Sequence, residues 1–248
     1  MNLLLIESEE ISSNNHVFLN DRRSNHILKT LRSKIGDFIS AGIINGPMGK
    51  AEILKTNIEE NCIEIKFYED TTIKNPNPIN LTVIVALPRP KVASRIIRNC
   101  SEFGVKDIHF IHSYKVEKSY WQSPLLKEKN TRTQMLYGLE QSKDTSLPSL
   151  TFHRKFKPFV EDDLENIVLH NNLFVAHPYK SNESNNKFST KNINKDCKNI
   201  VIIGPEGGFI DYEIDLMKKN NCKIINLGSR IFRTETALST IIALFSFN

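Results

Sequence analysis

The stretch Ile200-Val201-Ile202-Ile203-Gly204-Pro205-Glu206-Gly207-Gly208-Phe209 joins a continuous apolar run to a glycine-rich loop. An apolar run without polar alternation is typical of a strand that is buried on both faces of a parallel sheet. Glycines in the following loop allow positive φ angles and let a ligand approach the main chain. A helix is expected to begin near Asp211 as its N-cap, with Glu213 in its first turn.

Comparable apolar runs recur on both sides of this stretch, and helical patterns separate them. Strands are predicted at residues 81–87, 108–111, 173–176, 200–203 and 224–227. One helix is expected to end near Phe103, and another lies around residues 130–141. This alternation is typical of an α/β fold with a mainly parallel sheet covered on both faces. Residues 180–198, rich in Asn, Ser and Lys, are expected to form a mobile surface loop.

The glycine-rich loop is a candidate binding site because ligands of open parallel sheets bind beyond the carboxyl ends of the strands. It differs from a phosphate-binding loop, since it has no Gly-Lys-Ser/Thr and Glu206 would repel phosphate. A neutral or cationic ligand therefore fits better than an anion. A tight structural turn is the alternative interpretation.

Two other strand ends carry candidate residues. Residues 224–227 lead into Gly228-Ser229-Arg230-Ile231-Phe232-Arg233-Thr234-Glu235-Thr236-Ala237, in which Thr234 is a credible N-cap. Ile231 and Phe232 are expected to order this loop against the core. Arg233 and Glu235 either face the same crevice as the glycine-rich loop or form a surface pair worth less than about 1 kcal/mol. The third strand end is the basic corner Pro88-Arg89-Pro90-Lys91.

The N-terminal part has a different pattern. Short β-type runs at 38–44, 51–54 and 63–67 are separated by turn signals and predict a small antiparallel unit. Before them, residues 25–33 are expected to form a short helix that ends near Gly36. Residues 71–80 contain two X-Pro steps and no hydrophobic period, so the predicted domains are 1–70 and 81–248, joined by a linker at 71–80.

Charge and composition narrow the class of protein. The net charge is +5, and 40% of the residues are hydrophobic, with no apolar run near the roughly 20 residues that cross a bilayer. The four cysteines form no Cys-x-x-Cys pair, so we expect a reduced cytoplasmic protein without a metal site. Two basic clusters are either an RNA-binding surface or solvated helix faces: Arg22, Arg23, Lys29, Arg32 and Lys34, and Arg89, Lys91, Arg95 and Arg98.

Taken together, these motifs resemble the ribosomal RNA small subunit methyltransferase E family. The resemblance rests on the segments 203–208 and 227–237, with support from Glu102-Phe103-Gly104-Val105, Glu140-Gln141-Ser142 and Leu147-Pro148. It reaches the first domain through Asn25-His26, Leu31-Arg32 and Gly36-Asp37. The likeness therefore spans nearly the whole chain.

The resemblance implies a fold, a cofactor and a reaction. The C-terminal domain would be an α/β trefoil-knot domain of the SPOUT class, and the N-terminal domain a PUA-like small β-barrel. The cofactor would be S-adenosyl-L-methionine, and the reaction would be methylation of N3 of one uridine in 16S ribosomal RNA, free or in the small subunit. The family also implies a homodimer.

Candidate cofactor residues follow from the resemblance, catalytic residues from the chemistry of N3 methylation, and RNA contacts from the basic clusters. Arg233 would stabilise negative charge on the uracil oxygens, while Glu206 or Glu235 would remove the N3 proton or orient a group that does. The cofactor would be held by Leu87, Pro88, Gly204, Pro205, Glu206, Gly207, Gly208, Leu227, Gly228, Ile231, Phe232 and Thr234. RNA would contact Arg22, Arg23, His26, Lys29, Arg32, Arg89 and Lys91.

The chain departs from the family pattern at two places. It has Asn99 where relatives usually have Lys, and Lys143-Asp144 where they usually have Gly-Arg. Either departure could line the RNA surface or the dimer edge. A non-catalytic or retargeted RNA-binding paralogue of the same fold is therefore the alternative function. A nucleotide-binding oxidoreductase is disfavoured because no Gly-x-Gly-x-x-Gly follows the first strand of the second domain.

Overall fold

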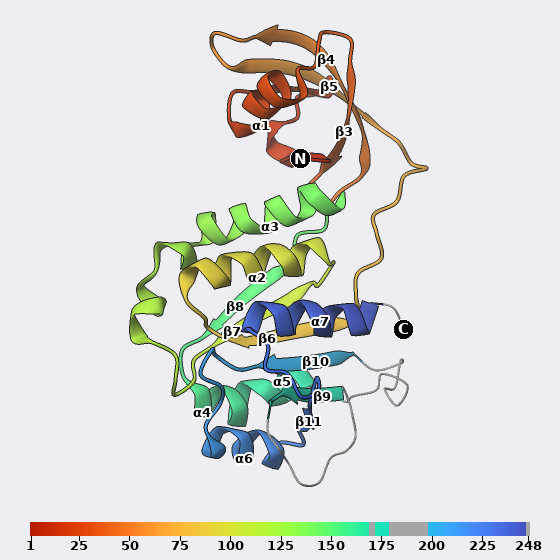
Figure 1. The fold of residues 1–248 in the computed structure, drawn as a ribbon. Coiled ribbons are helices and arrows are strands. Elements are labelled where there is room, and N and C mark those ends of the chain that lie inside the picture. The colour runs from red at the N-terminus through yellow and green to blue at the C-terminus, as the bar shows by residue number, and fades with distance from the viewer. Residues whose placement is uncertain (169–171, 179–197, 247–248) are drawn as a thin grey trace. The chain divides into compact units, whose positions relative to one another are not determined.

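The structure is a computed structural model that describes residues 1–168, 172–178 and 198–246 (Figure 1). The chain forms two compact units. The first unit comprises Met1–Asn77 and Met135–Leu147, and the second comprises Pro78–Gln134 and Pro148–Asn248. Apart from Lys198, the loop expected at 180–198 lies outside the described residues.

The second unit is built on a six-stranded sheet in which every neighbouring pair is parallel. The strand order is β11-β9-β10-β6-β7-β8. These strands are β6 (Leu81–Ala86), β7 (Asp107–Ile111), β8 (Ser149–His153), β9 (Asn172–Ala176), β10 (Asn199–Ile203) and β11 (Lys223–Ile225). The mainly parallel sheet is confirmed, and among the described strands of this sheet the sequence prediction missed only β8.

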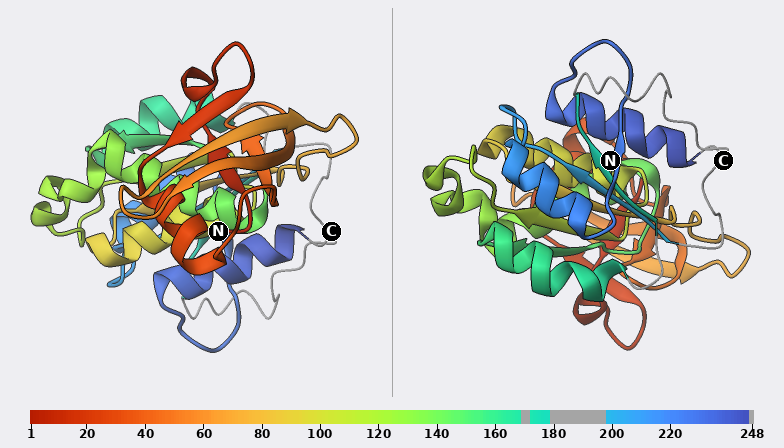
Figure 2. Two further views of the ribbon diagram at one scale, coloured as in Figure 1. Left: turned by 90° about the horizontal axis from the view of Figure 1, so that it is seen from above. Right: turned by 90° about the horizontal axis from the view of Figure 1, so that it is seen from below.

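Helices cover both faces of this sheet. Helices α2 (Pro90–Glu102) and α7 (Thr234–Ser246) lie on one face, and α4 (Phe156–Pro158) and α5 (Leu164–Val168) lie on the other (Figures 1 and 2). The α2 helix buries Val92, Ala93, Ile96, Ile97 and Cys100, whose spacing of three or four residues places them on one helix face. Helix α6 (Asp211–Lys219) follows the glycine-rich loop. Its N-cap is Ile210, so the predicted N-cap Asp211 is instead the first helical residue.

The first unit contains a five-stranded sheet in the order β1-β3-β4-β5-β2. Its strands are β1 (Leu4–Ile6), β2 (His16–Leu19), β3 (Phe38–Ile43), β4 (Met48–Asn57) and β5 (Cys62–Glu69). The antiparallel pairing of β3, β4 and β5 confirms the predicted unit. Side chains alternate along these strands, and Ile53, Ile65 and Phe67 point into the core.

The helix of the first unit begins earlier than predicted. It runs through α1 (Arg22–Asn25) and a π-helical continuation, η2 (His26–Leu31), rather than over residues 25–33. Asp21 caps it, because its carboxylate accepts a hydrogen bond of 2.7 Å from the main-chain nitrogen of Arg23. Arg32 ends it in the left-handed region with φ of 55°.

The end of α3 (Glu128–Ser142) belongs to the first unit, although the predicted boundaries place it in the second. Leu139 is fully buried there in a small core. That core contains Leu3, Leu5, Ile44 and Met48, with Leu136 and Leu147 packed against it. Main-chain hydrogen bonds also join these segments, since the nitrogens of Asn2 and Leu3 both donate to the carbonyl of Glu140.

The family departure at Lys143-Asp144 lies directly after α3. Asp144 is buried, and its Oδ1 accepts a hydrogen bond of 2.8 Å from the nitrogen of Ser146. The expectation that Asp144 lines an RNA surface or a dimer edge is therefore wrong. Lys143 has φ of 58°, a left-handed conformation that Gly adopts without steric cost.

Replacing Lys143 by Gly is expected to stabilise the protein by about 1 kcal/mol, because Gly relieves the contact between Cβ and the following carbonyl oxygen. Urea denaturation followed by circular dichroism measures this change. Lys129→Gly is the matched control, since it removes the same side chain within helical backbone and is expected to cost about 0.5–1 kcal/mol. Equal destabilisation by both substitutions would contradict the prediction.

Candidate functional site

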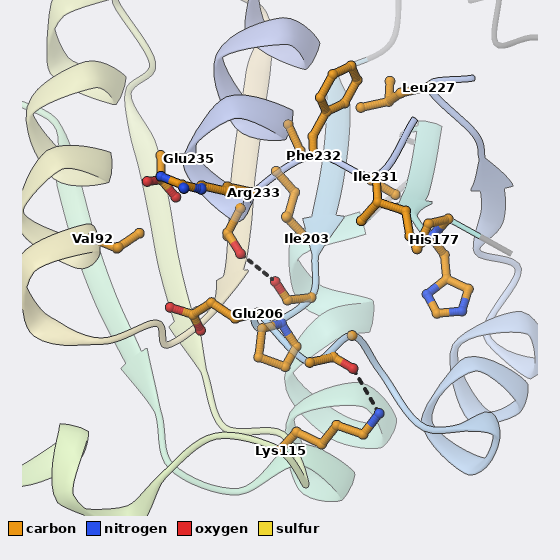
Figure 3. A pocket seen from close by; sticks show the side chains of 18 of the residues that line it. Val92, Lys115, His177, Ile203, Glu206, Leu227, Ile231, Phe232, Arg233 and Glu235 are labelled. Atoms are coloured by element: carbon orange, nitrogen blue, oxygen red, sulfur yellow. Dashed lines mark hydrogen bonds between the residues drawn. The ribbon is translucent and has the colours of Figure 1, made fainter. Parts of the chain in front are cut away.

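A cavity of about 720 Å³ opens beyond the carboxyl ends of β6, β9, β10 and β11 (Figure 3). It is the position at which open parallel sheets bind ligands. Residues 203–208 form one wall, and residues 225–227 with 230–235 form another. Both candidate loops thus border one cavity.

The glycine-rich loop is shaped by its lack of side chains. A Cβ at Gly204 would lie 3.2 Å from the ring of Phe209, which is buried beneath the loop. A Cβ at Gly207 would lie 2.9 Å from Cδ of Lys115. Gly208 has φ of 69°, which favours glycine. Gly204 and Gly207 are therefore required by close packing against Phe209 and Lys115, and Gly208 by its backbone conformation.

Two side chains fix this loop from outside. The ammonium group of Lys115, in the loop after β7, donates a hydrogen bond of 2.8 Å to the carbonyl of Gly207. The carboxylate of Glu213 in α6 is only 2% exposed. It accepts hydrogen bonds from the nitrogen of Tyr114 at 2.7 Å and from the nitrogen of Ile210 at 3.0 Å. Glu213 thus joins the loop after β7 to the end of the glycine-rich loop.

The C-terminal loop is attached to the glycine-rich loop by Thr234. Its buried hydroxyl donates to the carbonyl of Gly204 at 3.5 Å (Figure 3). Thr234 is the first residue of α7 rather than its N-cap. The expectation that Ile231 and Phe232 order the loop against the core is wrong, since Ile231 is 83% exposed and Phe232 is 38% exposed. Their apolar surface faces the cavity and solvent instead.

The three predicted catalytic side chains line the same cavity. Glu206 is exposed, and its Oε1 accepts a long hydrogen bond of 3.4 Å from the nitrogen of Arg89. Glu235 is largely buried and lies 3.6 Å from the guanidinium of Arg95. Arg233 is exposed and, in Figure 3, lies with Glu206 and Glu235 on the side of the cavity opposite His177.

Some predicted cofactor residues do not line the cavity. Leu87 and Pro88 are buried and are not part of the lining, and Gly228 lies outside the lining although its neighbour Leu227 is part of it. Gly204, Pro205, Glu206, Gly207, Gly208, Leu227, Ile231, Phe232 and Thr234 do line it.

Sequence reasoning missed the wall that comes from β7 and β9. Lys115, Glu117 and Tyr120 line the cavity from the segment after β7, and His177 lines it directly after β9. Their position after strand ends was the available signal. Burial lowers the pKa of His177, so its ring is neutral at neutral pH. Partial burial and a 3.2 Å hydrogen bond to Glu117 raise the pKa of Tyr120.

The predicted RNA-binding arginines of the first unit are held by carboxylates. Arg22 forms a bidentate pair with Glu140, and Arg23 pairs with Glu10 and Asp21. Burial opposes the charge on Arg23, but these hydrogen bonds outweigh it and raise its pKa. Both arginines are therefore engaged within the first unit, although Arg22 stays exposed, and their contact with RNA stays a prediction.

The remaining RNA-binding candidates are accessible. Lys29, Arg32, Arg89 and Lys91 are exposed, and His26 is half-buried. Partial burial and the N-terminal ammonium group lower the pKa of His26, so its ring is uncharged at neutral pH.

Trp121 is held by a hydrogen bond to His112. The indole nitrogen of buried Trp121 donates to Nδ1 of His112 at 3.0 Å, so Trp121 packs in the loop.

No group of three metal-binding side chains occurs within the described residues. In the same part of the chain, each helix is too short or too polar to cross a membrane.

Comparison with known proteins assigns a family to this cavity-bearing unit. Residues 75–246 match the RNA methyltransferase domain family. The chain belongs to this family. Among curated RNA methyltransferases, it is 28% identical to ribosomal RNA small subunit methyltransferase E 1 of Borreliella burgdorferi, covering 96% of this chain and 94% of the relative. It is 27% identical to ribosomal RNA small subunit methyltransferase E of Treponema pallidum, covering 96% and 87%.

Solved structures support the fold of this RNA methyltransferase. The structure of ribosomal RNA small subunit methyltransferase E from Neisseria gonorrhoeae, bound to S-adenosyl methionine, gives a TM-score of 0.75 at 21% identity. It matches 98% of this chain and 95% of that one. A Legionella pneumophila protein in complex with the same cofactor gives 0.76 at 19% identity, covering 98% and 96%. The second unit therefore has the α/β fold of these two structures.

Glu213→Gln is expected to destabilise the protein by about 1–3 kcal/mol, because an amide cannot accept from both main-chain nitrogens that now share this buried carboxylate. Chemical denaturation measures the loss, and hydrogen exchange should show faster exchange at Tyr114 and Ile210. Asp215→Asn on the same helix is the control and should change stability by less than about 0.5 kcal/mol. Unchanged exchange at both amides would contradict the role of Glu213.

Proposed function

We propose that this RNA methyltransferase uses S-adenosyl-L-methionine to methylate N3 of a specific uridine in the ribosomal RNA of the small subunit. The observation that carries the proposal is the cavity itself. Its two loops meet at the carboxyl edge of the sheet and place Arg233, Glu206 and Glu235 on its lining. Relatives named ribosomal RNA small subunit methyltransferase E match nearly the whole chain.

The cavity has the size and chemistry for S-adenosyl-L-methionine. Its volume of about 720 Å³ lies within the range of small-molecule sites. Main-chain groups of residues 204–208 and the side chains of Leu227, Ile231, Phe232 and Thr234 would hold the cofactor. The carboxylates of Glu206 and Glu235 complement a sulfonium cation. The bound cofactor supplies an electrophilic methyl group.

The residues of this chain would prepare the uracil for transfer. N3 carries a proton, which must leave before or during methylation, and the resulting negative charge spreads to the uracil oxygens. Glu206 is better placed than Glu235 to accept the proton, since Glu206 is exposed whereas Glu235 is largely buried beside Arg95. Arg233 supplies a cation that stabilises the charge on the oxygens.

The position of N3 sets a condition on the RNA. N3 lies on the Watson-Crick edge, so the target base is unpaired or splayed out of its helix when it enters the cavity. The exposed cations Arg89 and Lys91, at the start of α2, are candidates for phosphate contacts beside it. Lys29 and Arg32 are candidates in the first unit.

Other features of the family belong to the same proposal. They are a trefoil knot in the second unit, a PUA-like barrel in the first, a homodimer and a cytoplasmic location. A retargeted or non-catalytic RNA-binding paralogue is less well supported. The departure at Asn99 is accommodated by a 3.5 Å hydrogen bond to Ser239 of α7, and the departure at Asp144 is buried. Both departures are compatible with the catalytic fold.

Incubating the protein with S-adenosyl-L-methionine and small ribosomal subunits that lack the modification is expected to produce 3-methyluridine. The nucleoside is quantified by mass spectrometry after digestion of the RNA. Naked 16S RNA in a parallel reaction distinguishes the two substrate forms. Absence of 3-methyluridine together with calorimetric binding of S-adenosylhomocysteine would point to the retargeted paralogue, and absence of both would remove the enzyme proposal.

Arg233→Ala is expected to lower kcat by about 10²–10³-fold, because it removes the cation that stabilises the uracil oxygens. Calorimetry should show S-adenosylhomocysteine affinity within a few-fold of the unmodified protein. Lys219→Ala, a surface substitution at the far end of α6, is the control and should leave turnover unchanged. Turnover of Arg233→Ala within a few-fold of the unmodified protein, with intact cofactor binding, would exclude this role.

A further inference from the structure

The sheet of the first unit has one face that its core does not use. Ile39, Ile53, Ile65 and Phe67 point to the core side. Because successive side chains alternate, the residues between them point to the opposite side. This second face carries Phe38, Lys50, Lys66 and Tyr68, which we call the aromatic face.

Two large rings are exposed on the aromatic face. Phe38 is 58% exposed and Tyr68 is 41% exposed. Their ring centroids lie 6.2 Å apart, although they belong to β3 and β5 on either side of β4. The two rings form an exposed aromatic pair that the core does not need.

Lysines interleave with the rings. Lys50 of β4 is the register partner of Tyr68, and Nζ of Lys66 lies 5.4 Å from the centroid of the Tyr68 ring. The carboxylate of Glu52 accepts a 2.8 Å hydrogen bond from the Tyr68 hydroxyl. Farther along β5, Glu64 is paired with Lys55 at 2.7 Å and with His16 at 2.9 Å. Lys50 and Lys66 therefore lie beside the rings, together with Glu52, which stands between Phe38 and Lys66 in the register, and with Asp70 near Lys50.

We propose that the aromatic face binds a single-stranded segment of RNA, with bases stacked on Phe38 and Tyr68 and phosphates beside Lys50 and Lys66. Open sheet faces bind single strands in this way, since every base has a π-face and the backbone needs nearby cations. A protein partner is disfavoured because the centres of protein interfaces are depleted of lysine. The choice of RNA as the ligand rests on the proposed function, whereas the existence of the stacking surface does not.

The aromatic face is separate from the residues assigned to RNA above. Lys29 and Arg32 belong to the π-helical turn and its end, whose buried members Ile27 and Leu28 pack into the core on the other side of the sheet. Stacking also differs from a phosphate contact in its dependence on strandedness, because bases within a duplex have no free face. The aromatic face therefore predicts a preference for single-stranded over double-stranded RNA.

The test is fluorescence anisotropy of the full-length protein with a labelled oligouridylate of about ten nucleotides, a length within the range of such sites. Phe38→Ala and Tyr68→Ala should each weaken binding by roughly fivefold to a hundredfold. Tyr68→Phe retains the ring and should bind within twofold of the unmodified protein. Lys50→Ala should reduce the slope of log affinity against log salt concentration by the amount expected for about one phosphate contact.

Ile58→Ala is the matched control, because Ile58 is 68% exposed in the turn between β4 and β5 and lies off the aromatic face. It should leave affinity unchanged. Thermal unfolding reports whether each variant folds. If Tyr68→Ala does not fold, Phe38→Leu, which removes a ring, is compared with Phe38→Tyr, which keeps one.

Three results would overturn the proposal. They are wild-type affinity in the Phe38→Ala/Tyr68→Ala double variant, equal weakening by Ile58→Ala, and a dimer by light scattering that the double variant abolishes while RNA affinity persists. Calorimetry with S-adenosylhomocysteine on the same variants keeps the two proposals apart. If the double variant binds both S-adenosylhomocysteine and RNA like the unmodified protein, only the proposal for the aromatic face is rejected. If the unmodified protein does not bind S-adenosylhomocysteine, only the enzyme proposal is rejected.

Discussion

The burial of β10 between β6 and β9 is the constraint on which the second unit depends. Every residue of β10 is buried, and its register with both neighbours extends from Asn199 to Ile203. Because all six strands are parallel, the placement of β10 brings its carboxyl end to the same edge as theirs. The glycine-rich loop must therefore leave the sheet beside the ends of β6 and β9. The cavity follows from this crowding of loops at one edge.

The C-terminal loop at that edge gains little order from apolar packing, since Ile231 and Phe232 are exposed. A few polar contacts join the loops to one another. Glu213 joins two segments from beneath, Lys115 holds the carbonyl of Gly207, and Thr234 reaches the carbonyl of Gly204. A buried carboxylate with two main-chain donors holds a definite geometry, because an alternative position would leave a buried charge without hydrogen bonds. The site is thus positioned by hydrogen bonds on a scaffold positioned by apolar burial.

The sequence predicted those features that depend on local pattern. Continuous apolar runs located β6, β7, β9 and β10, and glycine spacing located the main loop of the cavity. The edge strand β8 was missed because polar and apolar residues alternate from Ser149 to His153, as expected of a strand with one exposed side. The first unit's β1 and β2 have only three and four residues, too few for a periodic signal.

Features that depend on distant partners were beyond sequence reasoning. Arg22 belongs to a basic cluster, but its partner Glu140 is 118 residues away in sequence. Lys115, Glu117 and Tyr120 follow a predicted strand, but their polar segment has no recognisable motif, so their position after the strand was the signal that sequence offered. Ile231 and Phe232 were assigned to the core because apolar side chains are usually buried, whereas loops beside a cavity can expose them.

The division of α3 has a consequence for biosynthesis. The first unit requires Leu136, Leu139 and Leu147 to cover Leu3, Leu5, Ile44 and Met48, and these two sets are separated by the whole segment from Pro78 to Gln134. During translation, the N-terminal sheet leaves the ribosome well before the residues that complete its core. The N-terminal unit therefore cannot finish folding ahead of the rest, although N-terminal domains generally fold first. Its completion is tied to the synthesis of the first two strands and first helix of the catalytic unit.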